Sequence, residues 1–111
     1  MDASNPPTDR QPGDAFWCEP QPAGGVVRIG CIEAWMEGLG GDPVGLELLP
    51  AGTQVMAGDS FGMLHLPERS VDLRSPWTLK ITTVNREALN DARLVKLSPS
   101  YRGWLIEAVL E

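Results

Sequence analysis

The sequence predicts a mainly β domain, either a sandwich or a barrel, with one or two short helices. Three observations support this fold class. Short apolar runs rich in β-branched residues recur along the chain, turn signals separate them about every eight to ten residues, and helical segments are too few for alternating βαβ units. A chain of 111 residues has room for one domain with a modest core.

The elements follow from local patterns. A helix over 33–39 is predicted by the spacing of Trp35, Met36 and Leu39, and Gly40 and Gly41 end it. A second short helix is expected over 86–91. The expected strands are 26–32, 44–49, 53–56, 61–66, 71–74, 77–84 and 103–110.

Pro67 suits the second position of a tight turn, so 61–66 and 71–74 should form a hairpin with the turn Leu66-Pro67-Glu68-Arg69. Strand alternation assigns two faces to the first strand of this hairpin. It predicts Phe61, Met63 and His65 on one face and Gly62, Leu64 and Leu66 on the other.

Residues 1–14 are rich in proline and polar residues and are expected to be a disordered segment, because they cannot bury enough apolar surface. Phe16 and Trp17 are the first residues able to anchor to a core, so the domain is expected to span 15–111. The chain starts without a basic segment followed by an apolar one, which predicts a cytoplasmic protein. Its apolar runs are too short for a membrane span.

The net charge of -6 comes from 15 acidic and 9 basic residues. This balance argues against nucleic-acid partners and against docking on anionic membranes. Cys18 and Cys31 are expected to be reduced thiols, with Cys31 a small buried hydrophobe, although a bridge between them stays possible. His65 has no Cys or His near it in sequence, so no metal site is expected.

Several short motifs occur in order between Gly25 and Glu111, and together they resemble the glycine cleavage system H-protein family. They cover about four fifths of the chain, and from Phe61 to Leu105 they share one register without gaps. The second motif has one glycine more than the family pattern. The motifs are Ile29-Gly30-Cys31-Ile32, Leu39-Gly40-Gly41-Asp42, Leu46-Glu47-Leu48-Leu49-Pro50-Ala51-Gly52-Thr53, Gly58-Asp59-Ser60-Phe61-Gly62, Asp72-Leu73-Arg74-Ser75-Pro76, Val84-Asn85, Leu94-Val95 and Gly103-Trp104-Leu105.

The resemblance implies the barrel-sandwich hybrid fold of lipoyl and biotinyl carrier domains. In that family a lysine at the tip of the hairpin forms an amide with lipoate. The same register here reads His65-Leu66-Pro67-Glu68-Arg69, and Glu68 stands at the lysine's place. A carboxylate cannot form that amide, so no lipoate cofactor is expected. Neighbouring Arg69 cannot replace the lysine, because its guanidinium stays protonated.

The preferred interpretation is a non-catalytic interaction or regulatory module whose contact hairpin comprises His65, Leu66, Pro67, Glu68 and Arg69. Its partner would be a protein, such as an enzyme of a lipoate-dependent complex. At Glu68 itself, loss of the lysine by drift is favoured over a newly acquired contact, since charged turn residues are mostly just solvated. Trp35 and Trp77 are further candidates for the partner surface, although packing against the sheet is favoured for each.

Two rival functions stay open. The first is a true lipoyl carrier, with acylation on Lys80 or in an alternative register. Such a carrier must use Lys80 or Lys96, the two lysines of the chain. The second is an enzyme using His65 and Glu68, which is disfavoured because the sequence shows no nucleophile, metal cluster or phosphate-binding loop beside them. A solvent-facing histidine at a strand end is the favoured interpretation of His65.

Overall fold

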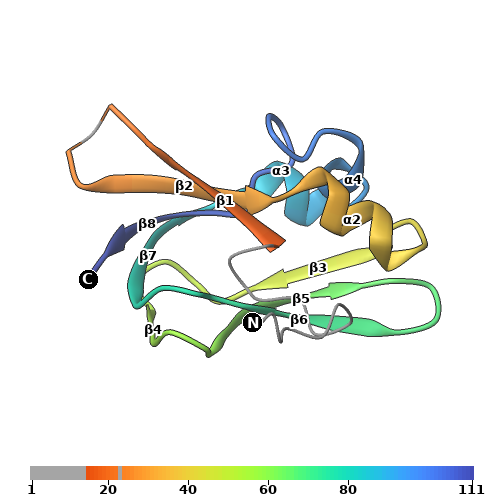
Figure 1. The fold of residues 1–111 in the computed structure, drawn as a ribbon, viewed down its shortest axis with the longest axis horizontal. Coiled ribbons are helices and arrows are strands. Elements are labelled where there is room, and N and C mark those ends of the chain that lie inside the picture. The colour runs from red at the N-terminus through yellow and green to blue at the C-terminus, as the bar shows by residue number, and fades with distance from the viewer. Residues whose placement is uncertain (1–14, 23) are drawn as a thin grey trace, which may run out of the picture.

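A computed structural model describes residues 15–22 and 24–111 (Figure 1). The predicted disordered segment 1–14 lies outside the described residues. Over the described part, no helix is long and apolar enough to cross a membrane. The helices are α2 (Glu33–Leu39), α3 (Arg86–Asn90) and α4 (Leu94–Leu97). The strands are β1 (Phe16–Pro20), β2 (Val26–Cys31), β3 (Gly45–Leu48), β4 (Gln54–Val55), β5 (Ser60–His65), β6 (Ser70–Arg74), β7 (Leu79–Val84) and β8 (Ile106–Leu110).

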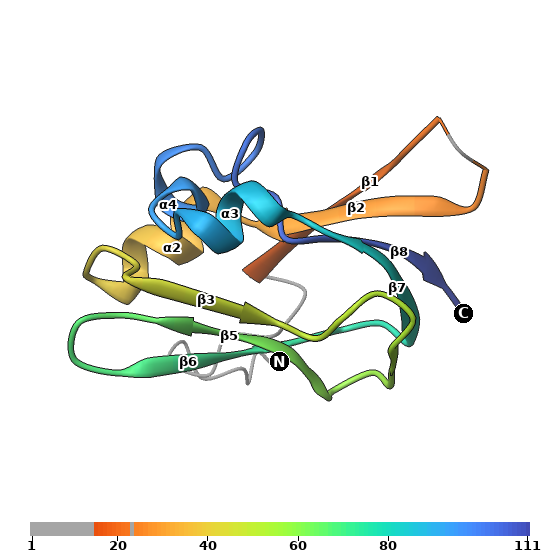
Figure 2. The same ribbon diagram turned by 180° about the vertical axis from the view of Figure 1, so that it is seen from behind.

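The strands form two antiparallel sheets. One has the order β1-β2-β8-β7-β4 and the other the order β3-β5-β6. Figures 1 and 2 show the sheets as two layers, with α2, α3 and α4 gathered at one end together with the loop between β5 and β6. The mainly β prediction is confirmed, and the arrangement agrees with the barrel-sandwich fold that the resemblance implied.

The core lies between the two sheets. Apolar residues exposed by at most 1% come from both layers, including Ile29, Ile81 and Ile106 from the larger sheet and Phe61, Leu64 and Leu73 from the smaller. Phe16 joins the layers to the helical end, because its ring centroid lies 5.8 Å from that of Trp35 and 5.5 Å from that of Phe61. Its predicted anchoring role is confirmed.

Two elements are absent from the sequence prediction. β1 pairs with β2 in the register Phe16↔Cys31, and it is an edge strand, which tolerates Pro20 at its end. Helix α4 is a single turn, too short for a helical period to show in the sequence. Its presence places Lys96 on a helix beside α2.

The predicted faces of β5 are wrong at its start. The pairing of β5 with β6 shifts between Ser60↔Arg74 and Gly62↔Leu73, which leaves Phe61 as the extra residue of a β-bulge. The bulge turns Phe61 inward, so it is buried on the same side as Leu64 and Leu66, while Met63 and His65 stay partly exposed. A uniform two-residue alternation cannot anticipate this reversal.

The alternative prediction that Trp35 contributes to a partner surface is wrong. Trp35 is 9% exposed and packs in the core, as the favoured interpretation held. Trp77 is half-buried and packs against that core, as the favoured interpretation held. Cys31 is buried, as predicted, and both Cys18 and Cys31 are free thiols, so the alternative of a bridge is not realised.

Candidate functional site

The predicted hairpin is formed by β5 and β6. Its strands end on the pair His65↔Ser70, and the backbone N–H of Leu66 donates to the carbonyl oxygen of Arg69 over 2.7 Å. Leu66 is buried and holds the turn to the domain, whereas Pro67, Glu68 and Arg69 are exposed. The turn between β5 and β6 lies at the end of the domain where α2 lies (Figure 1), and Glu68 in this turn is exposed to solvent.

His65 sits at the base of the turn and joins three strands. Its Nε2 atom lies 2.7 Å from Oε2 of Glu47 on β3, and its Nδ1 atom lies 2.7 Å from Oγ of Ser70 on β6. Gly45 faces it from β3, where a Cβ would lie 3.3 Å from the imidazole Cδ2. The histidine is half-exposed at the strand end, as predicted, but its partners are Glu47 and Ser70 rather than Glu68 and Arg69.

The tip of the hairpin contacts the connection between α2 and β3. Nη2 of Arg69 donates to the carbonyl oxygen of Leu39 over 2.7 Å. A surface cleft of about 300 Å³ lies between the two segments, and it is lined by Gly40, Gly41, Leu66, Pro67, Glu68 and Arg69. Among the described residues, the Glu68 carboxylate has no hydrogen-bond or ion-pair partner.

The two lysines differ in accessibility. Lys96 donates to Oδ1 of Asp42 over 2.9 Å and to the carbonyl oxygen of Gly41 over 3.2 Å, so its ammonium group is held. Lys80 is exposed, but it lies within β7, between Gln54 of β4 and Val109 of β8. Neither lysine lies at the tip of the hairpin.

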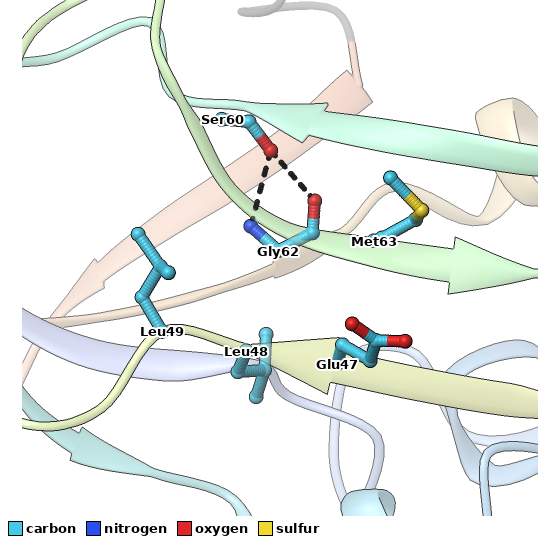
Figure 3. Close-up of a pocket in the computed structure, with 6 residues that line it drawn as sticks. All are labelled: Glu47, Leu48, Leu49, Ser60, Gly62 and Met63. Carbon is cyan, nitrogen blue, oxygen red and sulfur yellow. Dashed lines mark hydrogen bonds between the residues drawn. The ribbon is translucent and has the colours of Figure 1, made fainter.

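A second cleft of about 300 Å³ lies between β3 and β5 (Figure 3). It is lined by Glu47, Leu48, Leu49, Ser60, Gly62 and Met63. The hydroxyl of Ser60 is turned to the backbone, since it donates to the carbonyl oxygen of Gly62 over 2.8 Å. Glu47 is the one titratable residue in this lining, and it already pairs with His65, so the cleft offers no catalytic pair.

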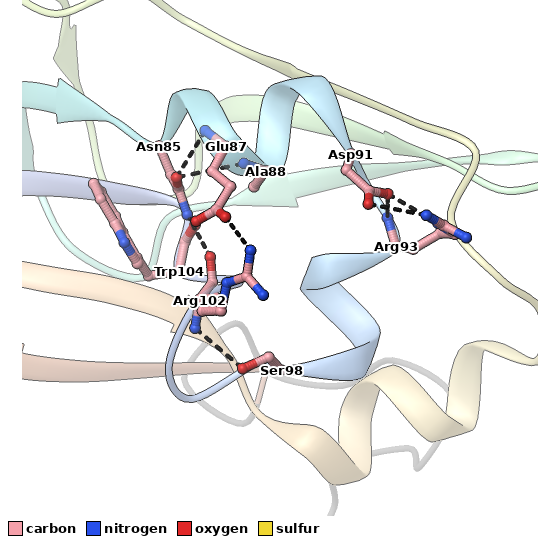
Figure 4. A network of polar contacts seen from close by, with 8 residues as sticks. All are labelled: Asn85, Glu87, Ala88, Asp91, Arg93, Ser98, Arg102 and Trp104. Atoms are coloured by element: carbon pink, nitrogen blue, oxygen red, sulfur yellow. Dashed lines mark hydrogen bonds and ion pairs between the residues drawn. The ribbon is translucent and has the colours of Figure 1, made fainter.

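A polar network joins α3 to the segment before β8 (Figure 4). Arg93 donates side-chain hydrogen bonds to Asp91, and this contact holds the pKa of the Asp91 carboxyl below its usual value. Arg102 pairs with Glu87, which raises the pKa of the guanidinium. All these ionised groups are mutually satisfied, so the network holds the backbone together rather than offering a reactive group.

No group of three His, Cys, Asp or Glu side chains suited to a metal ion occurs in the described part of the chain. Sequence reasoning found the hairpin but missed Glu47, Ser70 and Leu39, which bind its side chains. Glu47 and Leu39 are distant in sequence, by 18 residues from His65 and by 30 from Arg69. Without a turn or helical period to link such pairs, no local signal could reveal them.

The fold and the motifs agree with comparisons to known proteins. A family model described as glycine cleavage H-protein matches residues 13–111. The glycine cleavage system H protein of Mycolicibacterium vanbaalenii is 36% identical over 87 residues, which is 78% of this chain and 66% of that protein. The H protein of Chlorobium phaeobacteroides is 38% identical over 87 residues, or 78% of this chain and 68% of that protein.

The chain thus spans about two thirds of the length of the curated relatives it matches. Among solved structures, a glycine cleavage system H protein from Mycobacterium marinum superposes with a TM-score of 0.78 at 30% identity. That match covers 88% of this chain and 80% of the other. On the family model, the sequence relatives and the shared structure, this chain belongs to the glycine cleavage H-protein family.

Proposed function

We propose that this protein is an H-protein-like module that carries no lipoate and acts by contact with a protein partner through the hairpin 65–69. The observation that carries the proposal is Glu68, exposed at the tip of a well-formed hairpin where the family register places the attachment lysine. A carboxylate there cannot accept a lipoyl group as a stable amide. The partners would be enzymes of a lipoate-dependent system, and the module itself would not be an enzyme.

The alternative is a working lipoyl carrier modified at Lys80. Exposure of Lys80 favours it, because a ligase needs access to the ammonium group. The position of Lys80 argues against this alternative, since the residue lies in a strand flanked by two others and in the sheet that does not contain the hairpin. Lys96 is a weaker acceptor, because its ammonium group already binds Asp42 and the carbonyl oxygen of Gly41.

The deciding experiment is the intact mass of the protein after incubation with a lipoate ligase, lipoate and ATP. We expect an unchanged mass for the natural sequence. The variant Glu68→Lys tests whether the hairpin is still presented as an acceptor, and Glu68→Gln is its matched control. An increment of one lipoyl group on the natural protein would overturn the proposal, and its loss in a Lys80→Arg variant would establish the carrier alternative.

The contact surface has its own test. Glu68→Ala is expected to weaken capture of the protein's own partner, while Lys80→Ala, which changes an exposed residue on the other sheet, should leave capture unchanged. Unaltered capture by Glu68→Ala would remove the hairpin from the contact surface and leave the mass experiment unaffected.

A further inference from the structure

Arg69 was expected to contact a partner, but its guanidinium is directed to the domain itself. It donates to the carbonyl oxygen of Leu39, the last residue of α2. The final carbonyl groups of a helix lack partners within the helix, and α2 has no basic residue in its last turn to satisfy them. Arg69 supplies that missing donor from the neighbouring hairpin.

The tip has few other attachments. Within the turn, the N–H of Leu66 donates to the carbonyl oxygen of Arg69. Between residues 67–69 and any other described element, the bond from Arg69 to Leu39 is the one side-chain hydrogen bond present. The position of the exposed tip relative to α2 therefore depends on this single contact together with the burial of Leu66.

The connection that follows Leu39 is itself held by α4. Lys96 on α4 donates to the carbonyl oxygen of Gly41 and to the carboxylate of Asp42. Gly40 and Gly41 have positive φ angles of 70° and 146°, which only glycine adopts readily, so the connection is a tight turn away from α2. A Cβ on Gly41 would lie 3.7 Å from Cδ of Pro67, which puts the connection directly beside the tip.

These contacts bring the hairpin tip and the Gly40-Gly41 pair to one cleft. The additional glycine of the Leu39-Gly40-Gly41-Asp42 segment and the glutamate at the lysine's place both line the same cleft.

We infer that Arg69 is a positioning residue. It fixes the position of the hairpin tip, and with it Glu68, relative to the connection between α2 and β3, which is bound in turn by Lys96. Residues 39–42 and 66–69 therefore form one composite surface. This inference rests on the proposed function for its biological use, but its physical content concerns the free protein and needs no partner.

Spin labels measure the position of the tip directly. One label is placed at Glu68→Cys and a reference label at Lys80→Cys, both in a Cys18→Ser background, while buried Cys31 stays unlabelled. We expect a narrow distribution of label distances with Arg69 present and a broader one in Arg69→Met, whose side chain has no hydrogen-bond donor. Arg69→Lys should narrow it again, because an ammonium group can donate to the same carbonyl oxygen.

Hydrogen exchange at residues 39–42 and 66–69 provides a second readout on the protein with Glu68 in place. Arg69→Met should exchange about fivefold faster in both segments, the ratio given by loss of one ordinary hydrogen bond. Glu68→Gln is the matched control and should exchange like the parent, and the midpoint of urea unfolding should move little in all variants.

An unchanged distance distribution and unchanged exchange in Arg69→Met would overturn the inference. A lowered unfolding midpoint with uniformly faster exchange would also overturn it, since Arg69 would then support the whole fold rather than the tip. Neither result bears on lipoylation, so failure here is distinguishable from failure of the proposed function.

Discussion

The side-chain amide of Asn85 donates to the carbonyl oxygen of Trp104 over 2.7 Å, which ties the start of α3 to the segment leading into β8. The same amide donates to the carbonyl oxygen of Arg102 over 2.8 Å. Its oxygen accepts from the backbone N–H groups of Glu87 and Ala88 and so caps α3 (Figure 4). One side chain, 4% exposed, thereby satisfies four backbone groups.

Asn85→Ala should lower the free energy of unfolding by about 2–4 kcal/mol, because it removes a helix cap and leaves two partly buried carbonyl groups without their donor. Urea unfolding followed by circular dichroism measures the change. Asn90→Ala is the matched control, an exposed residue at the end of the same helix, and should change stability by less than about 0.5 kcal/mol. Equal effects of the two substitutions would contradict the role assigned to Asn85.

Two glycine substitutions should change the stability of the protein in opposite directions. At Gly62 on β5 a Cβ would overlap the carbonyl oxygen of Glu47 on the paired strand β3, so Gly62→Ala should destabilise the protein by about 1–3 kcal/mol. At Gly38 on α2 a Cβ would meet nothing within 4 Å, so Gly38→Ala should stabilise it by about 0.5–1 kcal/mol. Thermal unfolding of both variants tests this, and a stable Gly62→Ala protein would mean that β3 and β5 lie further apart.

The two thiols should react at different rates. Cys18 is exposed and should react with a thiol reagent in the native protein, whereas Cys31 is completely buried and should react only on unfolding. Burial also raises the pKa of the Cys31 thiol well above its ordinary value of 9.0. A count of labelled thiols before and after addition of denaturant checks the prediction, and two rapidly labelled thiols in the native protein would contradict it.

The buried Cys31 thiol also predicts a pH dependence of stability. Its folded pKa is raised, so the stability it contributes is fully present below the pKa of the unfolded chain and is lost as the pH rises above about 9, where only the unfolded chain ionises. Cys31→Ala should flatten the decline in unfolding free energy at alkaline pH relative to Cys18→Ala. Parallel curves for the two variants would contradict the prediction.

The exposed pair of Asp91 and Arg93 allows a direct electrostatic test. The hydrogen bond from the Arg93 side chain is the main reason that the pKa of Asp91 lies below 3.8. Arg93→Gln should therefore raise the pKa of Asp91 toward that value, as measured by NMR titration of the carboxyl group. Arg86→Gln, at the start of α3, should leave the pKa of Asp91 unchanged. An equal shift in both variants would mean that net charge, and not the hydrogen bond from Arg93, sets this pKa.

The sequence by itself determined the elements whose signals are local. β-branched runs and turn residues located most strands, the spacing of Trp35, Met36 and Leu39 located α2, and Pro67 located the turn that exposes Glu68. These features depend on side-chain period and backbone preference over a few neighbouring residues, which a single sequence displays.

Only the tertiary structure decided the features that join distant segments. The bulge that turns Phe61 inward, the burial of Trp35 beneath Phe16, and the bond from Arg69 to Leu39 each depend on which surfaces meet after the two sheets pack. Their energies come from contacts between residues far apart in sequence, so no local pattern encodes them. Arg69 is accordingly a charged turn residue in the sequence and a tie between hairpin and helix in the folded protein.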